Sequence, residues 1–225
     1  MYMPKATIDM VKIDTNSWNF YSVNNHQQIW TNDAGEALSL NFFEEKPDIP
    51  VAIKPEKINE LRKAYRGFAK QSGAAIISVE IVSICGIPSL EVILKKPFQG
   101  RPGFAFLGSV TIPLRDFSYV IRFESLERGT TGIREATVMM LEQPIPQIDK
   151  QTSKILGWVK DPYDAKFDKG ALYNLADQEK YDQMFDFHPL TRVRGHLHKL
   201  KQTIQIDSYV TDYPRHSGYW YKSIF

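Results

Sequence analysis

The sequence lacks several features that would place it in a specialised class of protein. Cys85 is its single cysteine among 225 residues, which excludes an intramolecular disulfide and is typical of a reducing compartment. No run approaches the roughly 18 consecutive apolar residues of a membrane span. The first residues, MYMPKATIDMVKID, have no secretory signal. The net charge of +2 does not indicate an extended surface for nucleic acid. We therefore expect a cytoplasmic protein that neither enters the membrane nor binds nucleic acid.

Catalytic and metal-binding motifs are missing as well. There is no H-E-x-x-H pattern, no cysteine cluster and no G-x-S-x-G turn. Residues 129–132, GTTG, lack the lysine of a phosphate-binding loop, and Cys85 has no histidine near it in sequence to serve as a base. The carboxylates of Glu124 and Glu127 are expected to be exposed or at a strand end, without a chemical role. The sequence predicts no catalytic residue, no metal ion and no cofactor.

What the sequence does contain is the patterning of an ordinary globular protein, with 43% apolar and 24% charged residues. Alternation of apolar and polar residues, interrupted by turn residues, predicts short antiparallel strands. These strands are expected at 6–13, 18–23, 28–31, 37–43, 75–84, 89–95, 104–113 and 118–126. Apolar residues spaced three and four apart predict helices. The helices are expected at 54–71, 133–141, 177–185 and 189–204.

The order of these elements predicts three parts of the chain. Residues 1–143 are expected to form an α+β core built on a twisted antiparallel sheet flanked by helices. The segment that follows contains two prolines and has no periodicity, so residues 144–160 are interpreted as a linker. Residues 161–225 are expected to form a helical and aromatic C-terminal extension packed on the core.

This layout resembles the superfamily that contains the photosystem II protein PsbP and the Ran-binding protein Mog. The resemblance rests on Trp18, on residues 37–43 (ALSLNFF), on the helix from Pro55, and on residues 108–113 (GSVTIP) and 132–136 (GIREA). It implies an antiparallel sheet sandwiched by helices. It also implies binding of proteins or ligands, with no catalytic residues to carry over. Bacterial members of related fold include chaperone-like adaptors for secreted effectors and periplasmic lipoproteins.

The C-terminal extension holds the predicted binding residues. One group is basic and lies on the helix expected at 189–204, and the other is aromatic and lies in the tail. The candidates are Arg192, Arg194, His198, Lys201, Tyr219, Trp220 and Tyr221. Two alternatives stay open: the basic residues could balance the acidic segment 161–186 within the chain, and the tail could fold back over the sheet.

The histidines of the extension are a second candidate feature. His196 and His198 would point about 200° apart on a helix, so we expect them to be solvated on its surface rather than to share a metal ion. His188 precedes the helix and His216 lies in the tail, so folding could bring histidines together. The alternative function is therefore a metal- or small-ligand-binding protein, or a hydrolase, that uses histidine and aspartate residues of 161–216.

The leading hypothesis from the sequence is a non-enzymatic protein-binding module of bacterial type. Its partner would be another protein, either a toxin that it neutralises as an immunity protein or a secreted effector for which it is a chaperone-like adaptor. The sequence does not define the oligomeric state.

Overall fold

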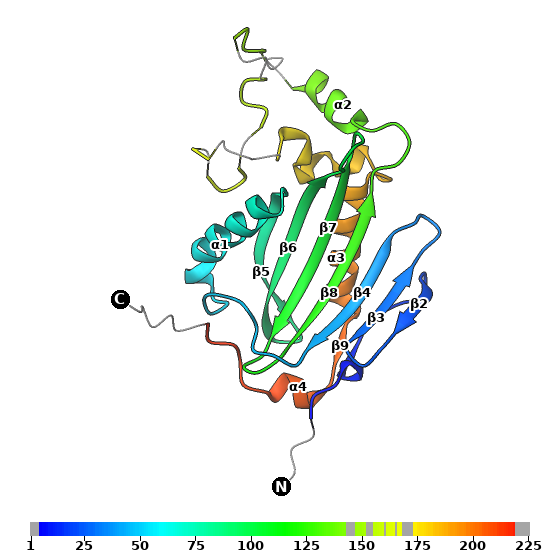
Figure 1. The fold of residues 1–225 in the computed structure, drawn as a ribbon, viewed down its shortest axis with the longest axis vertical. Coiled ribbons are helices and arrows are strands. Elements are labelled where there is room, and N and C mark those ends of the chain that lie inside the picture. Colours follow the sequence, from blue (N-terminus) through cyan, green and yellow to red (C-terminus); the bar gives the residue numbers. More distant parts are fainter. Residues whose placement is uncertain are drawn as a thin grey trace.

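The computed structural model describes residues 5–142, 147–151, 155–159, 161–164, 166–167 and 173–218. Its centre is a seven-stranded antiparallel sheet with the strand order β2-β3-β4-β8-β7-β6-β5 (Figure 1). The strands are β2 (Asn19–Val23), β3 (Gln27–Thr31), β4 (Ala37–Phe43), β5 (Ala75–Ile84), β6 (Ile87–Pro97), β7 (Phe104–Pro113) and β8 (Ser118–Leu126). A separate two-stranded pair joins β1 (Val11–Lys12) to β9 (Gln205–Ile206).

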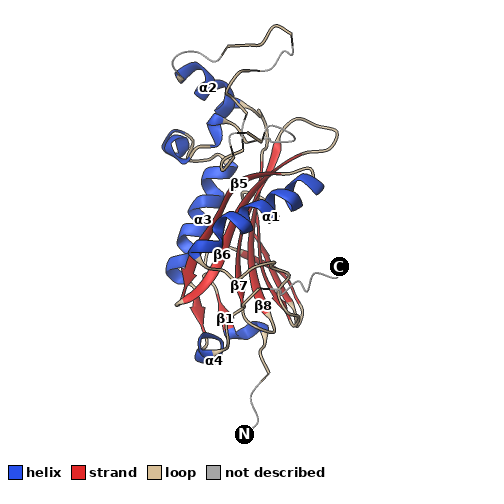
Figure 2. Ribbon diagram, turned by 90° about the vertical axis from the view of Figure 1, so that its left-hand side faces the viewer, coloured by secondary structure: helices blue, strands red, loops and turns tan. Residues whose placement is uncertain are grey.

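Helices cover both faces of this twisted sheet (Figure 2). The covering helices are α1 (Ile58–Gln71) on one face and α3 (Pro189–Thr203) on the other, whereas α2 (Ile133–Leu141) and α4 (Ser208–Asp212) lie beyond opposite ends of the sheet (Figure 1). Short 3-10 helices are η1 (Ile8–Met10), η2 (Pro55–Lys57), η3 (Leu175–Asp177) and η4 (Glu179–Met184). The predicted α+β class, a twisted antiparallel sheet with flanking helices and a helical C-terminal part, is confirmed. None of the helices among the described residues is long and apolar enough to cross a bilayer.

Two hydrophobic cores lie on opposite faces of the sheet. Successive residues of a strand point to opposite faces, and Val92 and Ile93 of β6 accordingly belong to different cores. The larger core receives Val193 and Leu197 of α3, and the smaller one receives Leu61 of α1.

Helix α3 approaches the sheet closely because of one glycine. A Cβ atom at Gly108 of β7 would lie 2.5 Å from Val193 and 2.9 Å from Leu197. Only a residue without a side chain allows this approach, so α3 is fixed over β7 and β8. The proposed division of the chain into core, linker and extension stays a prediction, but α3 shares its core with the sheet.

Three sequence predictions of local structure need correction. Residues 6–13 do not form one strand, because they contain η1 and the two-residue β1. Residues 177–185 do not form an α-helix but belong to η3 and η4, and Asn174 caps η3 by accepting the N–H of Ala176. The helix expected at 54–71 begins as a 3-10 turn at Pro55, before α1.

Candidate functional site

Most of the predicted basic binding residues on α3 form ion pairs within the chain. Arg192 contacts Glu36 at 2.8 Å, Arg194 contacts Asp182 at 2.8 Å, and Lys201 contacts Glu91 at 2.8 Å. These pairs hold α3 against the sheet and the preceding segment. The expected charge balance is therefore present, although only one of the three acidic partners, Asp182, comes from the segment 161–186.

The remaining predicted binding residues are placed differently. His198 is exposed on α3, where its Nε2 lies 2.9 Å from Nε2 of Gln202. Tyr219, Trp220 and Tyr221 lie outside the described residues. A role of these residues in partner binding stays a prediction.

Glu36 is the centre of a buried polar network beneath the middle of α3. Its side chain is 3% exposed and accepts hydrogen bonds from Asn32, Ser125 and Arg192, each at 2.8 Å. Nε2 of His196 lies 2.9 Å from the same carboxylate. Burial by itself raises the pKa of Glu36, but the hydrogen bonds from His196, Asn32 and Ser125 outweigh it and lower the pKa to about 2.

The prediction that His196 is solvated on the helix surface is therefore wrong, because its ring faces the buried carboxylate of Glu36. The His196 ring is stacked on the ring of Phe123, with 5.2 Å between the ring centres, and the ring of Trp18 packs against it at the same centre-to-centre distance. The predicted divergence of the two neighbouring histidines is confirmed, because His198 is exposed while His196 faces the buried carboxylate.

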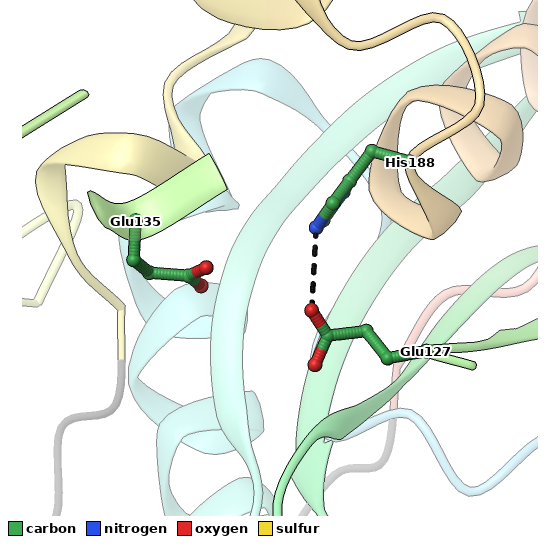
Figure 3. Close-up of side chains that lie close together, drawn as sticks. All are labelled: Glu127, Glu135 and His188. Atoms are coloured by element: carbon green, nitrogen blue, oxygen red, sulfur yellow. Dashed lines mark ion pairs between the residues drawn. The ribbon is translucent and has the colours of Figure 1, made fainter. Parts of the chain in front are cut away.

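A second cluster lies where the N-terminus of α3 meets α2 and the end of β8. It consists of Glu127, Glu135 and His188, and one potential ligand atom from each lies within 4.8 Å of the other two (Figure 3). Their side chains are 6%, 17% and 10% exposed. Of the two alternatives expected for Glu127, exposure or a position at a strand end, the structure shows the second: Glu127 directly follows β8 and is buried beside the beginning of α3.

The cluster is only partly satisfied by hydrogen bonds. Glu127 accepts the backbone N–H of Phe104 at 2.8 Å, and its Oε1 lies 3.6 Å from Nε2 of His188. Burial by itself raises the pKa of Glu127, but His188 and the N–H of Phe104 face the carboxylate and hold its pKa below the usual value. Nε2 of His188 and Oε2 of Glu135 are buried and have no hydrogen-bond partner among the described residues.

Lys95 borders this cluster and is completely buried. Its Nζ lies 3.1 Å from both carboxylate oxygens of Asp177 and 3.3 Å from Oε1 of Glu135. Burial raises the pKa of Asp177 even though Lys95 opposes the shift. The ammonium group also lies 4.3 Å from the ring centre of Phe104. One buried ammonium thus serves two carboxylates and leaves Oε2 of Glu135 open.

One member of this cluster could be singled out from the sequence, and the other two could not. His188 could be singled out because folding might gather histidines. Glu127 directly follows β8 and Glu135 lies in the first turn of α2. No recognised ligand spacing joins either glutamate to His188. Only the packing of α2 and α3 at the end of the sheet brings the three side chains together.

The β2 edge is a different kind of feature, a surface rather than a cluster. Phe20, Tyr21 and Val23 are 62%, 70% and 60% exposed on this edge strand of the sheet. The strand, NFYSV, contains neither a charged residue nor a proline. Its register with β3 shifts between Phe20 and Ser22, which places a bulge at Tyr21.

The opposite edge of the sheet, at β5, is covered by the chain itself. The hydroxyl of Tyr163 accepts the N–H of Val79 at 2.7 Å, and Arg62 donates to the carbonyl of Val79 at 3.2 Å. Asp161 accepts two hydrogen bonds from Arg66 of α1, both at 2.8 Å, and so fixes the segment that carries Tyr163. Backbone groups that another strand could use at Val79 are already occupied.

Comparisons with known proteins give architectural similarities only. No known family matches the sequence, and no curated protein is significantly similar to it. The Ran-binding protein Mog1p of Saccharomyces cerevisiae has a TM-score of 0.46 and 9% identity, covering 89% of this chain and 93% of that chain. A Bacteroides thetaiotaomicron protein has a TM-score of 0.34 and 9% identity, covering 56% of this chain and 41% of that chain. LpqN of Mycobacterium tuberculosis, involved in cell envelope biogenesis, has a TM-score of 0.32 and 14% identity, covering 57% of this chain and 78% of that chain.

Proposed function

We propose that this chain is a non-enzymatic protein-binding module whose β2 edge receives an extended segment of a partner protein. The observation that carries the proposal is the exposure of three large apolar side chains on an uncharged edge strand. An edge strand offers backbone N–H and C=O groups to a further strand, and apolar side chains on it add contact area.

The composition of β2 supports this proposal. Proteins protect edge strands from unwanted pairing with lysine, proline or a bulge, or by covering them. Of these devices β2 has only the bulge at Tyr21. At the β5 edge Tyr163 and Arg62 already occupy the backbone N–H and C=O of Val79, whereas no comparable contact to the backbone of β2 is present within the described residues.

The finer proposal concerns the partner. A toxin neutralised by this chain, or a secreted effector that it accompanies, would present an extended segment to β2. His198 and the residues Tyr219–Tyr221 are included as additional contacts. Arg192, Arg194 and Lys201 are already paired within the chain, so their substitution would disturb α3 as well as any partner contact.

The test is binding of the protein encoded by the neighbouring gene, measured by titration calorimetry. Phe20→Lys and Tyr21→Lys place a charge on the β2 edge and should weaken binding about tenfold or more. Phe187→Lys is the matched control, because Phe187 is 88% exposed outside the sheet. Equal affinities for the edge variants and the control, or no complex at all, would contradict the proposal.

A further inference from the structure

We propose that Glu127, Glu135 and His188 bind one divalent transition-metal ion of the Zn²⁺ and Mn²⁺ class. This site is independent of the β2 edge and lies where the sheet, α2 and the N-terminus of α3 meet. One imidazole nitrogen and two carboxylates form a donor set that such ions accept.

The distances suit an ion better than a hydrogen bond. Nε2 of His188 and Oε1 of Glu127 are 3.6 Å apart, beyond the usual length of an N–H···O bond. Two ligands that each bind an ion at about 2.1 Å in tetrahedral geometry lie about 3.4 Å apart. A carboxylate oxygen of Glu135 completes a triangle of potential ligand atoms whose sides are all within 4.8 Å.

The unsatisfied atoms give a second, independent reason. Within the part of the chain that the structure describes, Nε2 of His188 and Oε2 of Glu135 are buried without a hydrogen-bond partner. Buried polar atoms of this kind are uncommon and costly in folded proteins. In Figure 3 the side chains of Glu135 and Glu127 extend toward the imidazole of His188 from separate elements. A single ion would satisfy both open atoms and Oε1 of Glu127 together.

The neighbouring charges are compatible with a divalent ion. Lys95 contacts both oxygens of Asp177, which offset its charge, and it uses the other oxygen of Glu135. Glu127 has no lysine or arginine among its ion-pair partners in the described part of the chain. The carboxylates of Glu127 and Glu135 therefore still offer negative charge to an ion.

The donor chemistry also narrows the identity of the ion. The cluster contains no thiolate, so soft Cu⁺ is disfavoured, and it offers too few oxygens for Ca²⁺, which takes about six to eight oxygen ligands. Imidazole with carboxylate suits Zn²⁺ and Mn²⁺. Zn²⁺ is the probe of choice because three protein ligands are a common set for it.

Metal binding would change the hydrogen bonding at the start of α3. Nδ1 of His188 accepts the N–H of Leu190 at 3.2 Å, so the neutral ring carries its proton on Nε2. Coordination of a metal ion through Nε2 requires the other neutral tautomer, in which the single ring proton resides on Nδ1. The Leu190 hydrogen bond is lost at the same moment. Binding of the ion therefore has a specific signature at the Leu190 amide.

The experiment uses the full chain, stripped with EDTA and titrated with Zn²⁺. His188→Asn is the main variant, because asparagine is a preferred helix cap that can still accept the Leu190 N–H but lacks Nε2. Glu135→Gln removes the second ligand, and His198→Asn is the control on the same helix. Wild type and His198→Asn should retain about one ion per chain, whereas the two cluster variants should bind at least about tenfold more weakly.

Two further measurements make the outcome decisive. Zn²⁺ should raise the Tm of the wild type but not that of His188→Asn, since only an ion bound to the native state stabilises it. The Leu190 amide resonance of the wild type should shift on titration, which tests the site without any variant. Retention of far less than one ion by the wild type, or equal affinity in His188→Asn, would overturn the proposal. EDTA should leave partner binding at the β2 edge unchanged, so failure of one proposal is distinguishable from failure of the other.

Discussion

Two pairs of glutamate and histidine lie beneath α3, and they differ in how many donors surround the carboxylate. Glu36 with His196 lies beneath the middle of the helix, where asparagine, serine and arginine side chains also donate to the carboxylate. Glu127 with His188 lies at its beginning, where Nε2 of the imidazole and Oε2 of Glu135 find no hydrogen-bond partner in the described ranges of the chain. The same residue types therefore build a closed structural anchor in one place and an open set of ligands in the other.

The largest expected effect tests the closed pair. Glu36→Gln should lower the free energy of unfolding at neutral pH by about 3 kcal/mol, because Arg192 and His196 lose a buried ionised partner. Urea denaturation followed by circular dichroism measures this change, and Zn²⁺ should not restore it. A loss below about 1 kcal/mol would mean that the network contributes little to stability, and the contrast between the two pairs would break down.

The next effect is a dependence of stability on pH. The pKa of Glu36 is lowered to about 2 from an ordinary value of 4.5, so the folded state favours the ionised form. The stability that it contributes is complete above the unfolded-state pKa and is lost as the pH falls from about 5 toward 2, amounting to about 3 kcal/mol. Denaturation curves at pH 6, 4 and 2.5 should show this loss in the wild type. In Glu36→Gln the free energy of unfolding should fall less over the same pH interval. An equal fall in the wild type and the variant would contradict the lowered pKa of Glu36 as its cause.

The smallest effect on stability concerns the cluster of Glu127, Glu135 and His188 in the absence of a metal ion. Glu135→Gln in EDTA should change the free energy of unfolding by no more than about 1 kcal/mol, since it removes a charge with an unpartnered oxygen and a long contact to Lys95. His198→Asn, on the exposed face of α3, should stay within about 0.5 kcal/mol of the wild type. A loss in Glu135→Gln as large as that in Glu36→Gln would show that both clusters are structural anchors.

Much of the fold could be predicted because periodicity is local. The long strands β5, β7 and β8 alternate clearly, and the apolar positions of α3 repeat at helical spacing. The short elements at 8–12 and 175–184 could not be predicted, since a few residues carry no period. The alternation of apolar and polar residues identifies strands but not their neighbours in the sheet. The sequence therefore did not indicate that β2 and β5 form the edges.

The candidate metal site was harder to predict than the fold. The sequence places Glu127 at a strand end, but it does not show whether the side chain there is exposed or buried. Its burial depends on the packing of the remote N-terminus of α3 against the end of the sheet. His196 was misjudged for a similar reason, because its buried partner Glu36 lies 160 positions away.

The capped β5 edge has a consequence for stoichiometry. A sheet with two open edges can add subunits at both ends and grow into a filament. Here Tyr163 and Arg62 occupy the backbone N–H and C=O of Val79, which opposes strand addition at that point of the β5 edge. If a partner strand, or a second copy, pairs through β2 as proposed, we expect growth to end after one step and the complex to have a fixed size.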